Sequence, residues 1–444
     1  MNISDFKLKY NEFILSISYG NSVGIIGGTN KVILAHMEML ESIGISHVHI
    51  FPRFIRIPVL NVFALKHWGV TIDGNTLEQA YTYREIIQIL GHITKSGKQL
   101  KEVHVHHLWN MRLEQLETIL DIFIAPMKFY LHDYYTICFK ANLLKDNGKC
   151  CGKGAVSREK CQDCNYYSKA QIHSEAMKGF LAKYKKRLQF IAPSDAVKEI
   201  WISAYPAYKD QLRVVYHQSL IGQYRENSER IPDKAPLKVA FVGEQAFNKG
   251  WTQWENATRE AHELGRNEEF YHFGKSTSTV LYIQNIPVFF TSDNMNAMVE
   301  ALRGNRIAVA VLWSIWPETY SYTYYESSAA NTFIITNQCS GNIAKMVKER
   351  HNGIVLDNDE ELRALICDEI RLRKLVNEFK ESKNFGPLDL VENTELLQLL
   401  SKEKNIKTFI VPNNKDNLLL STKRQLVTML YKLHQFLKDK KKKW

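Results

Sequence analysis

Two stretches of this chain alternate short β-branched or aromatic runs with longer amphipathic patterns, and this alternation limits the possible folds. In the first stretch, residues 13–18 predict a strand, Gly27 and Gly28 predict a turn, and residues 31–43 predict a helix with one apolar stripe. Further strands are predicted at 47–51, 103–106 and 128–132. Strands that alternate with helices predict a parallel sheet covered by helices on both faces.

A second alternating unit begins at Leu237, after a polar segment at 222–236 that we interpret as a linker. A chain of 444 residues is also too long for one compact core. We therefore predict an α/β protein with two facing Rossmann-like domains, and ligands in the cleft at the carboxyl ends of their strands. The predicted bounds are 1–221, the linker, 237–400, and a helical segment with a basic tail at 401–444. Strands of the second unit are predicted at 238–242, 269–273, 287–290, 307–313 and 332–336.

The chain has a formal net charge of +11, and part of it lies in the lysine-rich tail at 438–444, after a predicted helix at 419–437. No nucleic-acid motif accompanies the charge, so we expect no nucleic-acid partner. A solvated tail and a weak contact with anionic membranes both stay open. The sequence has no run of about 20 apolar residues and no signal-peptide pattern. These features predict a cytoplasmic protein, either free or peripheral at the inner face of the membrane.

Two glutamates, Glu318 and Glu326, follow a predicted buried strand and have seven residues between them. The pattern places Glu318 in a loop at a helix N-terminus and Glu326 on that helix, about two turns later. Backbone N–H groups at such a loop can hold an anion. A carboxylate can accept hydrogen bonds from the vicinal hydroxyls of a ribose or a hexose. The segment therefore suits an anion and a sugar with vicinal hydroxyls, but two glutamates at this spacing also occur often by chance.

The same segment, residues 316–347, resembles the E-x7-E region of retaining GT-B glycosyltransferases of glycosyltransferase family 4. The motif SGNIAKMV at 340–347 and the motif HNGIVLD at 351–357 resemble the family motifs that follow. The resemblance implies a GT-B fold and transfer of a sugar from a nucleotide-diphosphate sugar with retention of configuration. It implies that Glu318 approaches the donor sugar and that Glu326 binds the ribose. Thr319, Tyr320 and Ser321 lie between them and are expected to contact the donor.

Other segments resemble the same family in the same order, and together they span residues from roughly 10 to 360. Gly27 and Gly28 resemble the first strand-to-helix turn, where glycine lets the backbone approach the donor diphosphate or the acceptor. The His132–Asp133 pair resembles a strand-end motif whose histidine reaches the transferred sugar. Gly243 and Lys249 resemble the phosphate-binding loop, in which the lysine would meet the diphosphate.

The sequence departs from the family pattern at three places. Glu244 stands near the position where the family usually has an arginine, and Ser321 replaces a glycine. The usual proline and glutamate of the later motif are Ala344 and Lys345 here. Loss of one positive charge would weaken the contact with a diphosphate, because charge-assisted hydrogen bonds are the strong ones. Lys345 is a candidate to compensate.

The resemblance implies a mechanism that requires no cofactor and no catalytic metal. Lys249 and loop amides would stabilise the leaving diphosphate, while Glu318 and His132 position the sugar. The expected partners are a UDP- or GDP-sugar donor and a glycan or lipid-linked acceptor, as in surface polysaccharide synthesis. The main alternative is a weak or inactive glycosyltransferase-like subunit that binds nucleotide, glycan or a partner protein. An oxidoreductase is excluded because no G-x-G-x-x-G motif follows a strand.

Cysteines gather in a predicted insertion at about 138–166. A structural zinc site, free thiols and disulfides are all compatible with this spacing. Disulfides are disfavoured if the chain is cytosolic, because the cytosol keeps thiols reduced. The zinc ligands would be Cys150, Cys151, Cys161 and Cys164, with Cys138 as an alternative. A histidine triplet, His104, His106 and His107, allows either a metal site or a strand end that borders the cleft. We favour the second interpretation.

Overall fold

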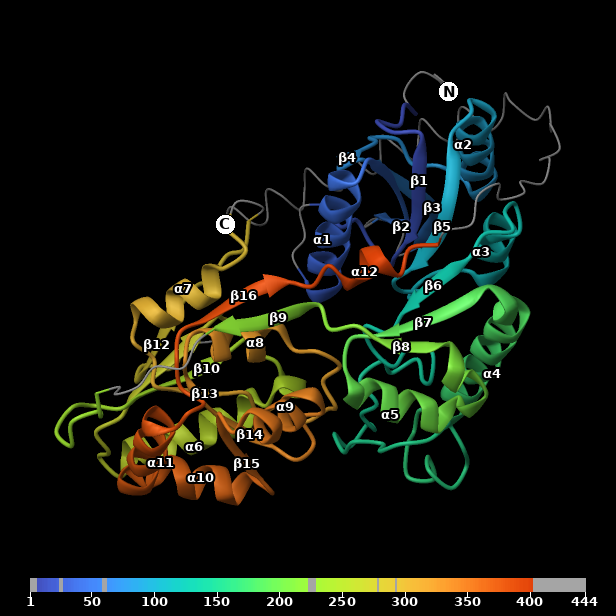
Figure 1. Ribbon diagram of the computed structural model, residues 1–444. Helices are drawn as coiled ribbons and strands as arrows, with labels where there is room; N and C mark the ends of the chain where they lie inside the picture. The colour runs from blue at the N-terminus through green and yellow to red at the C-terminus, as the bar shows by residue number, and fades with distance from the viewer. Residues whose placement is uncertain are drawn as a thin grey trace.

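A computed structural model of the chain describes residues 6–23, 27–57, 62–222, 229–277, 279–291 and 294–401, with side chains omitted at 54–57 and 62–66. The chain forms two α/β domains, each built on its own sheet, that face each other (Figure 1). The predicted helix at 419–437 and the basic tail at 438–444 lie outside the described residues.

The N-terminal sheet has eight strands in the order β4-β3-β2-β1-β5-β6-β7-β8. Strands β1, β2, β5, β6, β7 and β8 are parallel, as predicted, but β3 and β4 are antiparallel to their neighbours. Only four residues separate β2 from β3, and parallel pairing would need a much longer crossover. The strands are β1 Glu12–Ile17, β2 Ile45–Ile57, β3 Val62–Ile72, β4 Asn75–Thr76, β5 Gln99–Val105, β6 Met127–Tyr130, β7 Leu188–Ala192 and β8 Leu212–Val214.

Helices of the first domain connect these strands and cover the sheet (Figure 1). The N-terminus of α2 carries a capping box, in which Thr82 and Glu85 satisfy each other's backbone N–H groups. The fully buried Phe13, Ile86 and Phe190 belong to one core that joins β1, α2 and β7. The helices are α1 Gly28–Ser42, α2 Tyr83–Lys95, α3 Leu113–Leu120, α4 Tyr167–Tyr184 and α5 Asp195–Ala204, with short 3-10 helices at Lys185–Arg187 and Pro206–Gln211.

The C-terminal sheet is parallel throughout, in the order β12-β11-β10-β13-β14-β15. Numbered from its first strand, this is the 3-2-1-4-5-6 order of Rossmann folds. The predicted strand at 287–290 is wrong, because the third strand of this domain ends at Ile286. The elements are β10 Lys238–Val242, a 3-10 turn at Phe247–Lys249, α6 Trp251–Glu263, β11 Glu269–Phe273, β12 Ile283–Ile286, α7 Ala297–Gly304, β13 Val309–Val311, α8 Tyr322–Ala329, β14 Phe333–Asn337, α9 Asn342–Arg350, β15 Gly353–Leu356, α10 Asp359–Cys367 and α11 Glu369–Glu381.

Two segments cross between the domains. Strand β9, Gln218–Gly222, pairs antiparallel with β16, Leu388–Glu392 (Figure 1). The short helix α12, Glu395–Gln398, then packs on the first domain, where Leu396 joins a small core with Tyr130 and Ile191. The sequence-based bounds placed residues up to 400 in the second domain, whereas this last segment contacts the first.

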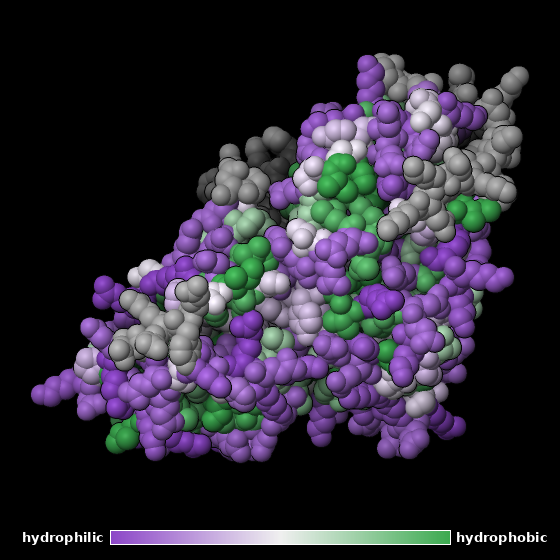
Figure 2. Space-filling model, in the orientation of Figure 1, coloured by the Kyte–Doolittle hydropathy of each residue, from purple (hydrophilic) through white to green (hydrophobic). Residues whose placement is uncertain are grey.

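Hydrophilic residues dominate the face shown in Figure 2, and hydrophobic residues gather there in separate patches on both domains. Among the helices of the described residues, none combines the length and apolar character needed to cross a membrane.

Candidate active site

A cleft of about 540 Å³ lies between the two domains. Its walls come from the ends of β6 and β10, the N-terminus of α1 and the loop that precedes α8. Every residue predicted to contact the donor or the transferred sugar lines this cleft. These residues are Gly27, Gly28, His132, Asp133, Gly243, Lys249, Glu318, Thr319, Tyr320, Ser321 and Glu326.

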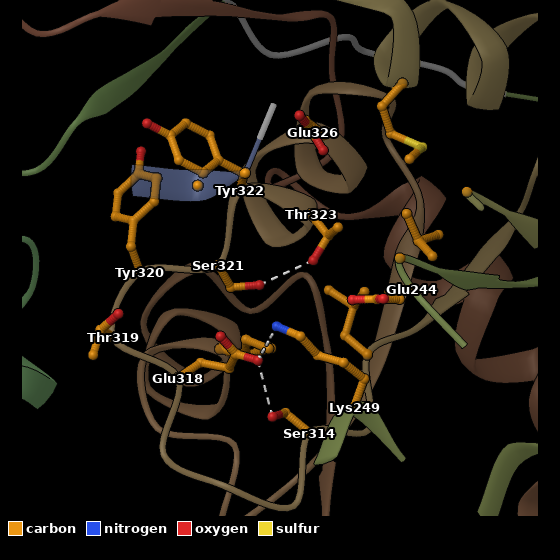
Figure 3. A pocket seen from close by; sticks show the side chains of 18 of the residues that line it. Glu244, Lys249, Ser314, Glu318, Thr319, Tyr320, Ser321, Tyr322, Thr323 and Glu326 are labelled. Atoms are coloured by element: carbon orange, nitrogen blue, oxygen red, sulfur yellow. Dashed lines mark hydrogen bonds and ion pairs between the residues drawn. The ribbon is translucent and has the colours of Figure 1, made fainter. Parts of the chain in front are cut away.

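Glu318 and Lys249 form an ion pair at the base of the cleft (Figure 3). Lys249 Nζ lies 2.5 Å from Glu318 Oε1, and the Ser314 hydroxyl donates to the same oxygen at 3.0 Å. The Glu318 side chain is 6% exposed, whereas the Lys249 side chain is 36% exposed. The lysine can therefore meet a ligand that enters the cleft, while the carboxylate stays fixed by two donors.

The loop that carries Glu318 is held by the N-terminus of α9. The Asn342 amide donates to the Glu318 carbonyl at 2.9 Å, and the Asn342 side chain donates to the Tyr320 carbonyl at 2.8 Å. Gly341 has a φ of +60°, and a Cβ at this position would lie 2.6 Å from the backbone N and O of Glu318. The motif around Gly341 thus places Glu318 by close backbone contact that only glycine allows.

Ser321 adopts a left-handed backbone with φ +68° at the N-cap of α8. A non-glycine residue in this region costs about 1–2 kcal/mol, and this cost explains why a glycine is usual here in the resembled family. The side chain recovers one hydrogen bond, 3.0 Å between its Oγ and Thr323 Oγ1.

We predict that Ser321→Gly increases the free energy of unfolding by up to about 1 kcal/mol, because relief of strain exceeds the added entropy of the unfolded chain. Urea denaturation of both proteins measures this difference. Ser321→Ala is the matched control, since it removes the hydroxyl but keeps the strain. A glycine variant no more stable than the alanine variant would show that the left-handed backbone carries no strain.

Glu326 is paired with a lysine from the opposite domain. Lys31 Nζ on α1 lies 2.9 Å from Glu326 Oε1, and the two side chains are 8% and 3% exposed. The same Nζ lies 3.3 Å from the centroid of the Phe290 ring, as a cation–π contact. Sequence reasoning missed Lys31. The available signal was a lysine near a helix N-terminus, where the helix dipole disfavours a cation and a specific partner must compensate.

His132 and Asp133 follow the end of strand β6, at the opposite wall of the cleft. Burial lowers the pKa of His132 well below its usual value, so its ring is neutral. His107 Nδ1 accepts from the Trp109 amide at 2.8 Å, so its Nε2 carries the proton and donates to Asp133 at 2.6 Å. Burial raises the pKa of Asp133, but the contact with His107, the hydrogen bond from the Tyr135 amide and the nearby His132 together outweigh it, and the net pKa is lowered. The favoured interpretation of His107, at a strand end beside the cleft, agrees with this position.

Thr319 and Tyr320 connect the site to the first domain and to the interdomain strand. Thr319 donates through Oγ1 to the His132 carbonyl at 2.7 Å, and its carbonyl accepts from Ser194 Oγ at 2.6 Å. The Tyr320 hydroxyl accepts from the Gln218 amide at 2.9 Å, and the side chain is buried. The Tyr320 ring is thus held by packing and by the Gln218 amide, and its carbonyl is held by Asn342.

Two of the sequence departures can now be placed. Glu244 lines the cleft, so its carboxylate faces the space where a diphosphate would lie. Lys345 does not compensate for it, because Lys345 Nζ lies 3.7–4.0 Å from Glu349, Glu199 and Asp195, away from the cleft. The additional lysine at the cleft is Lys31 instead, because α1 places its N-terminal turn in the cleft wall.

Zinc at the cysteines stays a prediction. All are free thiols, and burial raises the pKa of Cys138, Cys150 and Cys151, for Cys151 to about 12. Within the described part of the chain, which includes this insertion, no three of the sulfur atoms lie within 4.8 Å of one another. A zinc site here would need the cysteine loops to move closer together.

The sequence matches no protein-family profile and no curated protein. Among solved structures, sucrose-phosphate synthase from Thermosynechococcus elongatus has a TM-score of 0.50 and 12% identity, over 83% of this chain and 93% of that chain. A glycosyltransferase from Rickettsia africae ESF-5 has a TM-score of 0.46 and 15% identity, over 84% and 93%. Anabaena HepE in complex with UDP and glucose has a TM-score of 0.46 and 13% identity, over 84% and 95%. These identities are informative about the fold alone. The first likeness and the two facing sheets confirm the predicted GT-B fold.

Proposed function

We propose that this chain is a retaining glycosyltransferase that moves a sugar from a UDP- or GDP-sugar to a glycan or lipid-linked acceptor. The observation that carries the proposal is the convergence of Glu318, Glu326, His132 and Lys249 on one interdomain cleft. They come from separate elements of both domains, yet they surround a volume suited to a small ligand. We further propose a role in surface polysaccharide synthesis, in the cytoplasm or at the inner face of the membrane.

In the proposed reaction the nucleotide binds the C-terminal domain. Glycine at position 243, with φ +127°, lets the phosphates approach the backbone after β10. Lys249 stabilises the charge that develops on the leaving diphosphate. The bond between the sugar C1 and the diphosphate oxygen breaks, and the acceptor hydroxyl forms its new bond to C1 on the same face. Its proton passes to the departing phosphate, while Glu318 and His132 hold the sugar. This scheme uses no metal.

Glu326 would bind the ribose hydroxyls in this scheme. It already accepts from Lys31 Nζ through Oε1, and the other carboxylate oxygen remains to accept from a hydroxyl. The ion pair with Lys31 positions this carboxylate at the domain boundary, so ribose binding and domain closure would be coupled through one residue.

A second candidate function is a nucleotide-binding subunit without turnover. The observation that favours it is the charge of the cleft, where Glu244 faces the proposed diphosphate site and both Lys31 and Lys249 are already paired with glutamates. Binding of a diphosphate would have to compete with these pairs. Release of nucleoside diphosphate from a bound donor, with and without acceptor saccharides, separates the two candidates.

We expect one class of nucleoside diphosphate or its sugar to raise the melting temperature of the purified protein. A ligand that binds only the folded state stabilises it by about 2.7 kcal/mol when present at 100 times its Kd. A thermal-shift panel of nucleoside diphosphates and nucleotide sugars measures this. We expect Glu326→Ala to lose the shift, because the ribose then loses its acceptor.

Lys31→Met is the matched control for Glu326→Ala. Both variants lose the same interdomain ion pair, but only Lys31→Met keeps the Glu326 carboxylate. A shift retained in Lys31→Met and lost in Glu326→Ala assigns the ribose to Glu326. Equal losses in the two variants would assign the effect to the ion pair instead. No shift with any nucleotide would rule out both candidate functions.

A further inference from the structure

Behind His132, inside the first domain, lies a buried cluster of three histidines. His36 comes from α1, and His104 and His106 come from β5. One ring nitrogen of each lies within 4.8 Å of those of the other two. Their residues are only 7%, 0% and 1% exposed. The sequence-based triplet included His107, but the structure puts His36 in its place and turns His107 toward Asp133.

Two of these rings each have one nitrogen atom without a hydrogen-bond partner in the described part of the chain. Among the residues that the structure describes, His36 Nδ1 and His106 Nε2 are buried and have no hydrogen-bond partner. An unsatisfied buried polar atom costs on the order of 1–3 kcal/mol and calls for an explanation. The burial of all three rings favours their neutral form, because a charged imidazolium would lose its hydration there. Neutral imidazoles with free lone pairs are the form in which histidine binds metal ions.

The far sides of two rings are anchored as metal-binding histidines usually are. His104 Nε2 donates to Glu102 Oε1 at 2.8 Å, and Lys128 Nζ holds that carboxylate at 2.5 Å and 2.6 Å. His104 Nδ1 then accepts a hydrogen bond from the Tyr130 hydroxyl at 3.3 Å, and a metal ion would replace this bond. His106 Nδ1 lies 3.0 Å from His132 Nε2, which leaves its Nε2 for the cluster.

We propose that His36, His104 and His106 bind one divalent transition-metal ion, with Zn²⁺ as the best fit. Three imidazoles with a fourth position open to water are a recurrent zinc ligand set, and zinc–nitrogen distances are about 2.0–2.1 Å. This site is separate from the cysteine insertion and from the donor cleft, and it does not rest on the proposed function.

The ion would also determine a tautomer at the cleft. A metal on His106 Nε2 leaves the proton on its Nδ1, and that proton is donated to His132 Nε2. The proton of His132 is then on Nδ1. The metal would thus fix both the orientation and the tautomer of His132, the histidine that we propose contacts the sugar. This consequence, unlike the metal site itself, rests on the proposed function.

Cobalt(II) substitution of the full-length, metal-depleted protein tests the site, because Co²⁺ bound by imidazoles absorbs in the visible without a thiolate charge-transfer band. We expect one Co²⁺ per chain with visible bands in the wild type. We expect their loss in His36→Gln and in His104→Gln. His173→Gln is the matched control, since His173 is partly buried and hydrogen-bonded to a backbone carbonyl outside the cluster. Circular dichroism establishes that each variant is folded.

Each outcome of this experiment decides the proposal. Absence of cobalt binding in the folded wild type would overturn it, and this measurement needs no variant. A spectrum with only thiolate charge-transfer character would assign the metal to the cysteines and also overturn it. If both signals occur, the visible bands must survive in Cys161→Ser/Cys164→Ser and disappear in His36→Gln. Retention of the bands in both histidine variants would place the ion elsewhere.

Discussion

Replacement of Lys249 by methionine is expected to lower the rate of sugar transfer by about 100- to 1,000-fold, which is the typical effect of removing one preorganised donor at a developing charge. Methionine keeps most of the side-chain length and apolar contact but carries no charge. Because the Lys249 side chain is 36% exposed, we expect the variant to fold. Glu318 keeps the hydrogen bond from Ser314, which limits its reorientation. The loss should therefore fall on kcat rather than on the structure.

Steady-state kinetics with the nucleotide sugar selected by the thermal-shift panel measures this effect. Lys238→Met is the matched control, because Lys238 lies in the same domain, is 32% exposed and forms one ion pair, with Glu269. It does not line the cleft in the described structure. We expect it to retain transfer. A Lys249→Met variant that keeps transfer within about threefold would remove Lys249 from the role assigned to it.

Acidification below pH 6.5 is expected to destabilise the protein strongly. Burial lowers the pKa of His49 and His217 to about 3, and burial also lowers the pKa of His36, His47 and His132. In the unfolded chain these groups bind protons below their ordinary pKa of about 6.5, while the folded protein keeps them neutral. Stability is therefore complete above pH 6.5 and is lost as the pH falls toward the folded-state pKa.

The expected loss of stability on acidification is large. At pH 5.5 a histidine whose folded pKa is far below this pH contributes a loss of about 1.4 kcal/mol. His49 and His217 together then contribute about 3 kcal/mol, and the other buried histidines act in the same direction. A typical domain has only about 5–15 kcal/mol in total. Urea denaturation of the metal-free protein at pH 7.5, 6.5 and 5.5 measures the loss.

His217→Phe should reduce the loss of stability between pH 7.5 and pH 5.5 by about 1.4 kcal/mol, and it should lower the pH slope of stability accordingly. The slope is the informative quantity, because the substitution can also change stability at every pH. His351→Asn is the control, since His351 is exposed and its left-handed backbone, φ +51°, suits asparagine. An unchanged slope in His217→Phe would show that this ring is protonated in the folded protein.

The two lysine–glutamate pairs indicate how a donor would enter. Each proposed motif glutamate is already paired with a lysine, Glu318 within the second domain and Glu326 across the cleft. A diphosphate would compete with Glu318 for Lys249, whereas a ribose would bind the second carboxylate oxygen of Glu326 beside its pair with Lys31. The two ion pairs thus satisfy buried carboxylates that would otherwise be unpaired, as buried charges require.

Local patterns in the sequence were sufficient for most strands of the second domain, but not for β12, and for the loop and helix that carry Glu318 and Glu326. Strands β10 and β11 lie at the predicted residues 238–242 and 269–273, because a short buried run after a polar segment permits few alternatives. The E-x7-E spacing placed Glu318 in a loop and Glu326 on a helix, as observed in the structure. Both predictions depend on patterns over a few neighbouring residues, and a single sequence contains such patterns.

Tertiary structure decided the contacts that join distant segments. Lys31 and Glu326 are 295 positions apart, and His36 meets His104 and His106 only because α1 packs beside β5. No local pattern specifies such pairs, since they depend on the packing of whole elements and on the closure of one domain against the other. The sequence by itself therefore determined the two Rossmann-like domains and the residues at the ends of their strands. Only the tertiary structure decided which charges pair across the cleft and which histidines share a buried site.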